Sequence, residues 1–495
     1  MTFDKATESK LCTACKNILA GIDPAENKRL LDEALRNGGK SEDIAAVSCM
    51  QLPSSGDTVE LMNSDGTLKD GLRKKGIAAL KEHPAAFVML SGGAGTRYTD
   101  SARNLKKALD EGTMTDEQAQ TVAAFRKLSM DVDKCLSTGK LFAPISCIRE
   151  KGPFELNLEA VAEVISACGI DLPVVIFTGG TTREDVLSLL KKNDNFGIRH
   201  IAVCDQDELP FVREDDYTFM QRNGVNATGA NGGGGIIYSL GSARPVSPDG
   251  KTLFDGSVSE WLTSMHIENV IFSQTDDAKR SDIYAALAGV SENRRNETVF
   301  TQLCGHYPTA TTDGKPDFKL GSIWTNGNGA FACCEFAELK TEQVAQLTGG
   351  NAVSNTGMYL MSLSLINEVI ERGLLKIHCQ HHKKEDGSPV TKFEYFLPDM
   401  LAVASHENAK CRIAMLRSTE HIDAPLTNLT VDSLPAKDIG KLALAQMAKL
   451  LCDKALLSAN GIRVEEGALV EIAPFADLTK YEGTIVRSGE KKLFD

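Results

Sequence analysis

The stretch Ala85-Ala-Phe-Val-Met-Leu-Ser-Gly-Gly-Ala-Gly-Thr-Arg97 is the part of this chain that best indicates its fold. Six apolar residues follow Pro84 and run directly into Ser91 and three glycines. A short apolar run of this kind is typical of a buried strand that ends in a loop. Glycines there let backbone N–H groups approach a phosphate chain, and Arg97 adds a permanent positive charge. The stretch is therefore a candidate phosphate-binding loop, with an ordinary structural turn as the alternative.

The same strand-and-loop pattern recurs three times along the chain. Short apolar runs followed by a polar or glycine-rich loop are found at residues 173–177, 200–204 and 269–272. Helix-period patterns lie among them, over residues 158–168, 182–190 and 258–263. Strand–loop–helix units in series predict a mainly parallel sheet with helices on both faces. Ligands of such sheets bind at the carboxyl ends of the strands, where all four loops would meet.

Two familiar nucleotide-binding motifs do not match the glycine-rich loop. No Gly-Lys-Ser or Gly-Lys-Thr follows it, which excludes a Walker P-loop. Tyr98 stands where the third glycine of a dinucleotide fingerprint would be, and no acidic residue ends an obvious second strand. A dinucleotide-binding oxidoreductase therefore stays an alternative that shares the fold class but is disfavoured by these residues.

Composition limits the class of protein. The chain has 42% hydrophobic and 24% charged residues, which is ordinary for a soluble globular protein. Its net charge of −13 argues against a general nucleic-acid or membrane-surface binder, because phosphates would be repelled. The first residues show no apolar signal region, no apolar run has the length of a membrane span, and the 13 cysteines are scattered. We therefore expect reduced thiols and a cytoplasmic protein.

A length of 495 residues suggests two to three domains. We expect an N-terminal helical region at 1–84, a catalytic domain at 85–430 and a small C-terminal domain at 431–495. The charged, helix-forming stretch at 100–138 is predicted to be an insertion that forms a lid or a subunit contact. Residues 286–315 are predicted to be rich in loops. Cys12 and Cys15 form a lone CxxC pair, which favours ordinary helix-face cysteines over a metal or redox site.

The glycine-rich loop also carries a resemblance to a known family. Gly-Gly-x-Gly-Thr-Arg after an apolar strand resembles the signature of nucleotidyltransferases that make sugar nucleotides. Later segments are similar to the eukaryotic-type UDP-N-acetylglucosamine pyrophosphorylases and their UDP-sugar pyrophosphorylase relatives. They match in order over about residues 85–480, and include Gly139-Lys140 before Phe154-Glu155, Ile176-Phe-Thr-Gly, Asn195-Phe-Gly-Ile, Asp205-Gln206-Asp-Glu-Leu-Pro210, Gly232 to Gly235, Asp276-Asp277, Glu335, Asn355-Thr-Gly357, Lys392-Phe-Glu-Tyr, Leu416-Arg417, Ala-Pro425-Leu-Thr-Asn428 and Val470-Glu-Ile-Ala-Pro474.

The resemblance implies a fold and a reaction. The fold would be an α/β, Rossmann-like nucleotidyltransferase of the glycosyltransferase-A-like kind, with a mixed, mainly parallel central sheet. The reaction would join UTP and a sugar 1-phosphate into a UDP-sugar and pyrophosphate, with Mg²⁺ as cofactor. N-acetylglucosamine 1-phosphate is the sugar phosphate that the resemblance favours. The expected partners are these two substrates, without nucleic acid or membrane, for a monomer or a homodimer.

The resemblance also implies a role for each matched residue. Residues expected to bind the UTP phosphates are Gly92, Gly93, Gly95, Thr96 and Arg97. Lys140 would neutralise the α-phosphate and the attacking phosphate, and Asp276 would bind Mg²⁺, with Asp277 as a possible second ligand. Residues expected around the uracil are Gln206, Gly232, Gly233 and Gly234. Those expected near the sugar or its phosphate are Glu335, Asn355, Gly357 and Lys392.

Each of these residues also has a plainer interpretation. Lys140 and Lys392 could be surface lysines, Asp276 could cap a helix, and Glu335 and Asn355 could cap turns.

Several departures from the family pattern leave alternatives open. Gly233 and Met358 stand where the family has Asn, Thr427 replaces a Lys, and the segment from Arg97 to Lys140 is longer than usual. The alternatives are a glucose 1-phosphate or broad-specificity pyrophosphorylase, and a non-catalytic protein that binds sugar nucleotides.

Overall fold

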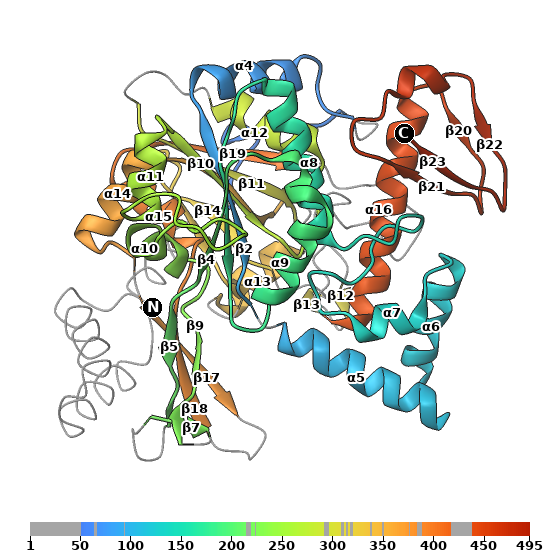
Figure 1. Ribbon diagram of the computed structural model, residues 1–495, viewed down its shortest axis with the longest axis horizontal. Coiled ribbons are helices and arrows are strands. Elements are labelled where there is room, and N and C mark those ends of the chain that lie inside the picture. The colour runs from blue at the N-terminus through green and yellow to red at the C-terminus, as the bar shows by residue number, and fades with distance from the viewer. Residues whose placement is uncertain are drawn as a thin grey trace.

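The protein is described by a computed structural model (Figure 1). The described residues are 51–63, 67–93, 95–213, 219–222, 224–291, 297–307, 311–312, 315–316, 320–336, 339–348, 351–375, 377–383, 389–416 and 438–495. The CxxC pair and the matched motifs at Arg417 and at Pro425 to Asn428 lie outside them. Among the described helices, none combines the length and the apolar character needed to cross a membrane.

A 10-stranded mixed sheet forms the centre of the molecule, with its main path in the order β1-β19-β11-β16-β10-β2-β3-β4. Neighbouring strands on this path are parallel, except that β16 runs antiparallel to β10 and β11. Strands β14 and β15 extend the sheet from β16. The bounds of the ten strands are β1 Thr58–Glu60, β2 Ala85–Ser91, β3 Val174–Thr178, β4 Ile201–Asp205, β10 Asn269–Gln274, β11 Val299–His306, β14 Ser322–Thr325, β15 Phe331–Cys334, β16 Val353–Ser362 and β19 Lys410–Leu416. The predicted mainly parallel α/β sheet is confirmed.

Strand β2 shows why several strands of this sheet are continuous apolar runs in the sequence. Successive side chains of a strand point to opposite faces. Phe87 and Met89 lie in the hydrophobic core on one face, whereas Ala86 and Val88 lie in the core on the other. Because both faces are buried, residues 85–90 of the strand are all apolar rather than alternating with polar ones.

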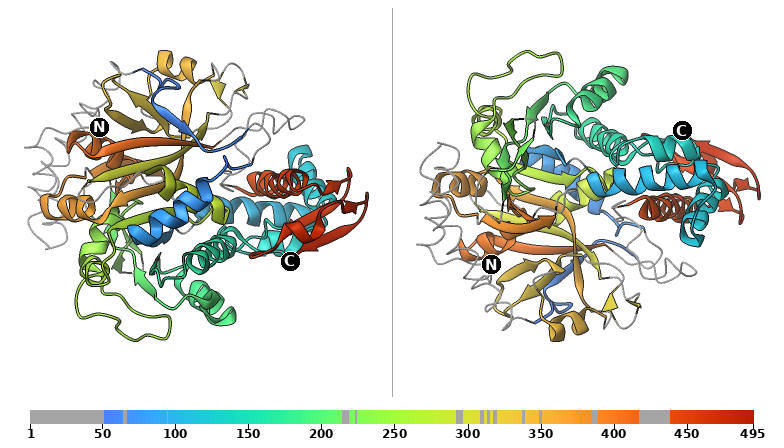
Figure 2. Two further views of the ribbon diagram at one scale, coloured as in Figure 1. Left: turned by 90° about the horizontal axis from the view of Figure 1, so that it is seen from above. Right: turned by 90° about the horizontal axis from the view of Figure 1, so that it is seen from below.

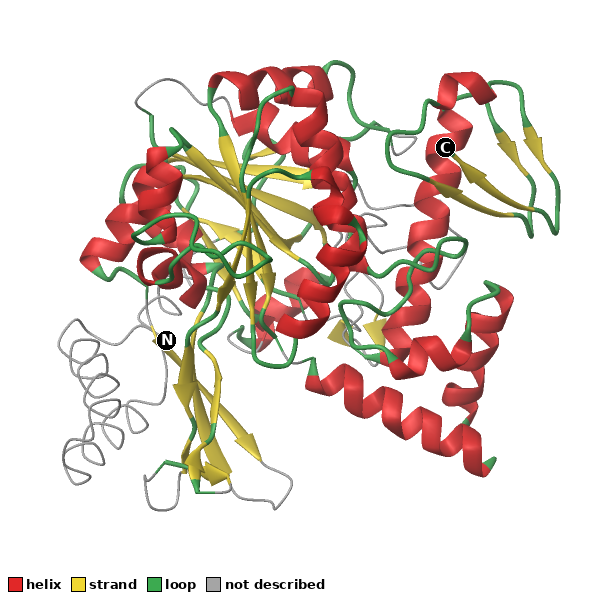
Figure 3. Ribbon diagram, in the orientation of Figure 1, coloured by secondary structure: helices red, strands yellow, loops and turns green. Residues whose placement is uncertain are grey.

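Two groups of helices provide these two cores, one on each face of the sheet (Figure 3). The first group is α4 Leu72–Glu82, α8 Pro153–Cys168, α9 Arg183–Lys192 and α12 Ser281–Ser291. The second group is α10 Gly235–Ser242, α11 Val258–Ser264, α14 Leu363–Arg372 and α15 Asp399–His406. The central part of the chain is therefore a three-layer α/β structure.

A third hydrophobic core lies beside the sheet and joins segments far apart in the sequence (Figure 2). Helices from residues 96–137 and the C-terminal elements both contribute to it. Their bounds are α5 Thr96–Glu111, α6 Asp116–Lys127, α7 Val132–Ser137, α16 Ile439–Ala459, β20 Arg463–Val464, β21 Leu469–Ile472, β22 Ile485–Val486 and β23 Lys491–Phe494. We call residues 438–495 the C-terminal unit. The predicted insertion thus packs against that unit.

Short accessory elements complete the described part of the chain. Most of the small strands lie in hairpins, several of which project from the lower edge of the sheet in Figure 1. They are β5 Glu208–Pro210, β6 Val212–Arg213, β7 Gln221–Arg222, β8 Val225–Asn226, β9 Thr228–Ala230, β12 Thr311–Thr312, β13 Lys315–Pro316, β17 Ile377–Lys383 and β18 Pro389–Tyr395. The remaining helical pieces are α13 Thr341–Leu347 and the 3-10 turns η1 Asp194–Gly197 and η3 Leu478–Tyr481.

The prediction of a loop-rich segment at 286–315 is wrong. The segment holds the end of α12 and all of β11. Strand β11 lies between β16 and β19 and is almost completely buried. Its apolar run is interrupted by Gln302, so that neither a continuous run nor a regular alternation marks it as a strand. Within 1–84, the described residues also include β1, which pairs with β19.

Candidate active site

The predicted site residues lie along one edge of the central sheet. Strands β4, β3, β2 and β10 are parallel, so their carboxyl ends meet at this edge. Gln206 follows β4, the glycine-rich loop follows β2, and Asp276 follows β10. Because β16 is antiparallel to β10, its first residues, including Asn355 and Gly357, lie at the same edge. Across the sheet the order is therefore Gln206, the glycine-rich loop, Asp276, and then Asn355 with Gly357. These are the candidates for binding uracil, phosphate, metal and sugar, in that order.

Hydrogen bonds from neighbouring strands fix the start of the glycine-rich loop. Ser91 Oγ donates to the carbonyl oxygen of Phe177 at 2.7 Å, and Thr182 Oγ1 donates to that of Ser91 at 2.7 Å. From the other side, Thr275 Oγ1 donates to the carbonyl oxygen of Leu90 at 2.7 Å. The start of the loop is thus held by β3 and by the segments that follow β3 and β10.

The same loop leads into the N-terminus of a helix. Helix α5 begins at Thr96 and has 16 residues, and Gly93 and Arg97 beside its start are exposed. Unpaired N–H groups and the helix dipole make such an N-terminus favourable for anions. Arg97 adds a full positive charge at this point. The loop and the first turn of α5 together therefore suit a phosphate chain.

Lys140 and Asp276, which are 136 residues apart in the sequence, form an ion pair at this place. Lys140 lies in a turn closed by hydrogen bonds from the Phe142 and Ala143 amides to the Gly139 carbonyl. A Cβ atom at Gly95 would lie 3.2 Å from Cβ of Lys140, so the glycine-rich loop touches this lysine. The side chains of Lys140 and Asp276 are 21% and 16% exposed. Both partly buried charges can therefore reach a ligand on the loop.

Asp276 fits Mg²⁺ as a ligand only when substrate phosphates complete the coordination of the ion. Mg²⁺ in nucleotide sites is usually held by one or two carboxylates together with phosphate oxygens and water. Among the described residues, no group of three or more His, Cys, Asp and Glu side chains could hold a metal ion. Asp277, expected as a possible second ligand, is buried and forms an ion pair with Lys279. The residues present thus fit a phosphate-bridging ion on Asp276 rather than a site made of protein alone.

Gln206 is packed between the glycine-rich loop and the second glycine-rich segment. Its side-chain nitrogen donates to Asn231 Oδ1 at 3.1 Å and to the carbonyl oxygen of Gly232 at 2.8 Å. A Cβ atom at Gly92 would lie 2.0 Å from Gln206 Oε1, so any larger residue there would displace this amide. Gln206 and Lys140 therefore contact positions 92 and 95 of one loop. Three residues span at most about 10 Å, which is within the length of a nucleotide.

The second glycine-rich segment, residues 232–235, is held by β18 and leads into α10. Gly232 has φ +85°, and a Cβ atom there would lie 2.4 Å from the carbonyl oxygen of Tyr395. The amide of Gly234 donates to that same oxygen at 2.8 Å. Gly233 lies between Gly232 and Gly234. Asn231, just before the segment, is buried and accepts a hydrogen bond from Gln206.

Lys392 lies beside this segment on β18 and is paired with Glu394. A Cβ atom at Gly229 would lie 3.3 Å from Lys392 Cε, and one at Gly232 would lie 3.0 Å from Glu394 Cβ. Lys392 therefore lies on the same side of the edge as the uracil candidates. Its expected contact with phosphate stays a prediction.

The sugar candidates lie on the other side of β10. Asn355 Oδ1 accepts hydrogen bonds from Gln302 Nε2 at 3.0 Å, the Gly357 amide at 2.8 Å and the Tyr359 hydroxyl at 3.0 Å. A Cβ atom at Gly321 would lie 3.3 Å from Glu335 Oε1 and 3.6 Å from Asn355 Cβ. Glu335 and Asn355 thus flank one glycine.

Two glutamines near these residues were missed in the sequence. Gln274 ends β10, is exposed, and packs against Gly357, where a Cβ atom would lie 2.6 Å from Gln274 Cδ. Gln302 is buried in β11, and its Oε1 has no hydrogen-bond partner. A polar residue inside an otherwise apolar run was the available signal for Gln302. Met358, which replaces a family Asn, is fully buried in the core.

A cavity of ≈460 Å³ lies behind this edge rather than on it. It is lined by residues 277–282, directly after Asp276, and by side chains of α8, α16 and the segment after β21. Of the predicted site residues, only Asp277, expected as a possible second metal ligand, lines it. The candidate site is therefore the open edge of the sheet, and the cavity belongs to the contact between the C-terminal unit and the central layers.

Comparisons with known proteins gave matches only among solved structures. A scan against protein-family models and a search of curated proteins found no match. The chain is similar to the UDP-N-acetylglucosamine pyrophosphorylase from Trypanosoma brucei in complex with an inhibitor, with 18% identity, a TM-score of 0.59, and coverage of 96% of this chain and 88% of that chain.

Two further solved structures are similar over almost the whole chain. One is a provisionally named UDP-N-acetylglucosamine pyrophosphorylase from Entamoeba histolytica, with 13% identity, a TM-score of 0.61, and coverage of 90% of this chain and 100% of that chain. The other is a UDP-glucose phosphorylase from Trypanosoma brucei, with 14% identity, a TM-score of 0.52, and coverage of 97% and 98%. At these identities the likeness concerns the fold, and it agrees with the family resemblance seen in the motifs. The chain has the fold of solved UDP-sugar pyrophosphorylases.

Proposed function

We propose that this protein transfers the uridylyl group of UTP to a sugar 1-phosphate and releases pyrophosphate. The observation that carries the proposal is the Lys140–Asp276 ion pair, which touches the glycine-rich loop at the N-terminus of α5. A cation, a carboxylate and a set of N–H donors are thus gathered from three distant segments. Phosphoryl transfer depends on positioning and on neutralising phosphate charge, and these groups supply both.

The reaction needs little covalent help from the protein. A phosphate oxygen of the sugar 1-phosphate forms a bond to the α-phosphorus of UTP, and the bond from that phosphorus to the β-phosphate oxygen breaks. The electron pair leaves with pyrophosphate. Because the attacking oxygen is already an anion, no base has to remove a proton. The main obstacle is that two anions must meet, so positive charge at the α-phosphate is the decisive contribution.

Lys140 and the loop would divide the phosphates between them. The N–H groups of the loop and Arg97 would hold the β- and γ-phosphates at the start of α5. Lys140 would then exchange part of its contact with Asp276 for the α-phosphate and the incoming phosphate. Asp276 would hold Mg²⁺, which would supply positive charge to neutralise the phosphates.

The uracil would lie between Gln206 and residues 232–234. An amide side chain and nearby backbone groups offer both donors and acceptors, which the edge of uracil requires. Gln206 is only 9% exposed and is fixed by two hydrogen bonds, so it can present its amide without further ordering. This arrangement supports UTP as the nucleotide.

N-acetylglucosamine 1-phosphate is the proposed sugar phosphate. The two similar structures with the higher TM-scores are both named as UDP-N-acetylglucosamine pyrophosphorylases, and the motif series favours the same branch. Glu335 and Asn355 supply an acceptor and an amide on the side of β10 away from the uracil candidates. A glucose 1-phosphate or broad-specificity enzyme is the alternative, since Gly233 and Met358 differ from the family pattern.

The test is a pyrophosphate-release assay with UTP, Mg²⁺ and a panel of sugar 1-phosphates. We expect the highest kcat/KM with N-acetylglucosamine 1-phosphate, and little release when CTP, ATP or GTP replaces UTP. A higher kcat/KM with glucose 1-phosphate would support the same reaction but make glucose 1-phosphate the preferred substrate. Calorimetry that detects UDP-sugar binding, together with no pyrophosphate release from any pair, would favour the non-catalytic alternative.

A further inference from the structure

The two cations assigned to the UTP phosphates, Arg97 and Lys140, are supported by a different part of the molecule from most other site residues. Gln206 and Asp276 follow strands of the central sheet, and Asn355 lies on β16. Arg97 instead precedes side chains that are buried in the third core together with the C-terminal unit, and Lys140 lies between residues of the third core and residues of the core of the central sheet. The site is thus assembled from two bodies of packed side chains.

Helix α5, which begins beside Arg97, is tied to the C-terminal unit along one side. Tyr98, Ala102 and Leu105 are buried in the third core. The Tyr98 hydroxyl donates to the carbonyl oxygen of Cys135 at 3.0 Å, and Ser101 Oγ accepts from the Ile439 amide at 2.9 Å. The first turns of α5 therefore rest on the start of α16.

The loop after Lys140 passes from one core to the other. Leu141 is buried in the core of the central sheet, whereas Ala143, Ile145 and Cys147 are buried in the third core. Lys140 thus stands at the boundary between the two. Gln446 of α16 adds a hydrogen bond of 2.8 Å from its Nε2 to the carbonyl oxygen of Pro144.

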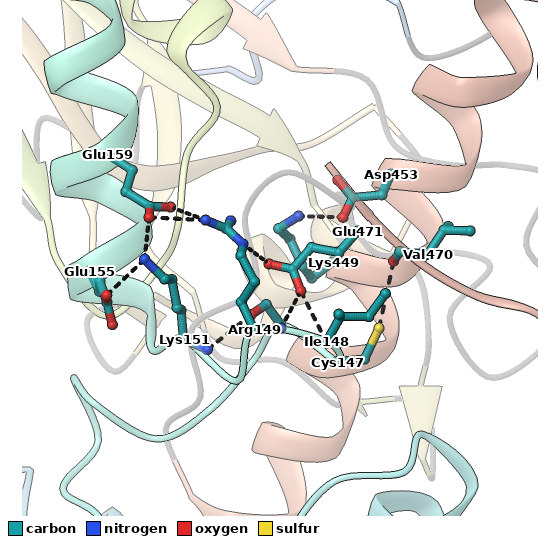
Figure 4. Close-up of polar contacts among 11 residues, drawn as sticks. Cys147, Ile148, Arg149, Lys151, Glu155, Glu159, Lys449, Asp453, Val470 and Glu471 are labelled. Carbon is teal, nitrogen blue, oxygen red and sulfur yellow. Dashed lines mark hydrogen bonds and ion pairs between the residues drawn. The ribbon is translucent and has the colours of Figure 1, made fainter. Parts of the chain in front are cut away.

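Glu471 of β21 holds the far end of the same loop (Figure 4). Its Oε2 accepts from the backbone amides of Ile148 at 3.0 Å and Arg149 at 2.8 Å, and its Oε1 accepts from Arg149 Nε at 2.6 Å. The Arg149 guanidinium also donates to both oxygens of Glu159 on α8 at 2.9 Å. Glu471 is 1% exposed, so these contacts are protected from water.

Nearby charge keeps this carboxylate ionised. Burial alone would raise the pKa of Glu471, but the Lys449 ammonium and the Arg149 groups more than compensate and lower that pKa below its usual range. A charged acceptor on a backbone amide makes a stronger hydrogen bond than a neutral one. At neutral pH the Ile148 and Arg149 amides of the loop therefore donate to a fully ionised carboxylate.

We propose that Glu471 is a positioning residue for Lys140: the C-terminal unit, through Glu471 and Gln446, holds the 139–149 loop so that the lysine lies against the glycine-rich loop and Asp276. The proposal rests on the proposed function. It assigns the C-terminal unit a part in catalysis, although none of its side chains needs to touch a substrate. Positioning errors of about 1 Å can lower a rate by about 100-fold, so loosening this loop is expected to be visible in kcat.

The test compares Glu471→Gln with Asp453→Asn. The first change keeps the size of the side chain but replaces one carboxylate oxygen with an NH₂ donor, which then faces a donor in either orientation: the two backbone N–H groups or Arg149 Nε. The second change perturbs the same buried region, where Asp453 pairs with Lys449, but leaves the contacts to the loop in place. We expect Glu471→Gln to lower kcat about tenfold with KM for UTP changed less than about threefold, and Asp453→Asn to lower it less than about twofold.

Hydrogen exchange gives a readout that does not depend on turnover. We expect Glu471→Gln to increase exchange in peptides covering 139–149, including the turn that carries Lys140, with β2 and β3 unchanged. Faster exchange only at residues 148–149, or an equal loss of kcat in Asp453→Asn, would overturn the proposal. An inactive wild type with the expected exchange pattern would refute the proposed function instead. If Glu471→Gln does not fold, Gln446→Met removes the neutral contact to Pro144 and carries the same two measurements.

Discussion

Replacing Lys140 with Met is the sharpest test of the proposed reaction. The substitution keeps a long apolar stem in the turn that follows Gly139 but removes the charge. The glycine-rich loop, the start of α5 and Arg97 are left in place, so UTP should still bind through its β- and γ-phosphates. Lys140 is proposed to act mainly as charge builds up between the two phosphates. The loss should therefore appear in kcat more than in KM.

The size of the effect follows from the burial of the pair. The Lys140 and Asp276 side chains are 21% and 16% exposed, so the site is neither dry nor freely solvated. An effective dielectric constant of about 20 suits such a place, and two unit charges about 4 Å apart then interact by about 4 kcal/mol. If this energy is available only in the transition state, its loss lowers the rate by about 10³-fold.

The measurement is pyrophosphate release at saturating UTP and sugar 1-phosphate. Lys127→Met, an exposed lysine at the end of α6, is the matched control and should stay within about twofold of the unaltered protein. Thermal unfolding of both variants checks that the fold is retained. A decrease in kcat of less than about tenfold for Lys140→Met would refute the assignment of this lysine to the reacting phosphates.

Three further predictions concern other parts of the structure. Asp276→Asn should raise the Mg²⁺ concentration for half-maximal activity by at least about tenfold, and a Mg²⁺ titration that matches the unaltered protein would remove Asp276 as a ligand. Gly232→Ala should destabilise the protein by about 1–3 kcal/mol, because φ is +85° and the new Cβ would meet the Tyr395 carbonyl at 2.4 Å. Urea unfolding measures this, with Gly180→Ala, where a Cβ meets nothing within 4 Å, as control. The lowered pKa of Glu471 should stabilise the fold above the ordinary glutamic acid pKa of about 4.3 and lose that effect as pH falls through the lower folded value. The unfolding free energy of Glu471→Gln should thus depend less steeply on pH below about 4, and equal slopes for the two proteins would contradict the role of this carboxylate.

The first half of the sheet could be predicted from the sequence because its strands are buried on both faces and end in distinctive loops. Strands β2, β3, β4 and β10 each begin within one residue of the expected position and follow one simple pattern. Strand β11 could not be recognised in the same way, because Gln302 divides its apolar run. The antiparallel strand β16 was missed as well, although it supplies Asn355 and Gly357 to the edge.

The candidate site was predictable to different degrees on its two sides. Topology alone brings Gln206, the glycine-rich loop and Asp276 to one edge, since each follows a parallel strand. Lys140 follows no strand, and α5, α6 and α7 separate it from the loop. Only the family resemblance indicated the role proposed for Lys140, and its contact with Asp276 depends on tertiary packing that no spacing in the sequence reveals. The contact of Glu471 with the Ile148 and Arg149 amides likewise depends on tertiary packing that the sequence does not reveal.

The third core gives a physical reason for the long segment between Arg97 and Lys140. Helix α5 alone could form the proposed phosphate-binding N-terminus, but its apolar side, with Tyr98 and Leu105, has to be buried. Helix α6 contributes Val122 and Phe125 to the same core, and α16 covers both helices. The apolar faces of α5 and α6 are thus buried against other parts of the same chain, as is usual for amphipathic helices that pack on a core. A lid that opens freely would expose these side chains to water, at a cost of about 1.5–3 kcal/mol for each large one. The arrangement therefore favours a fixed support for the two cations, which the C-terminal unit and the 100–138 segment build together.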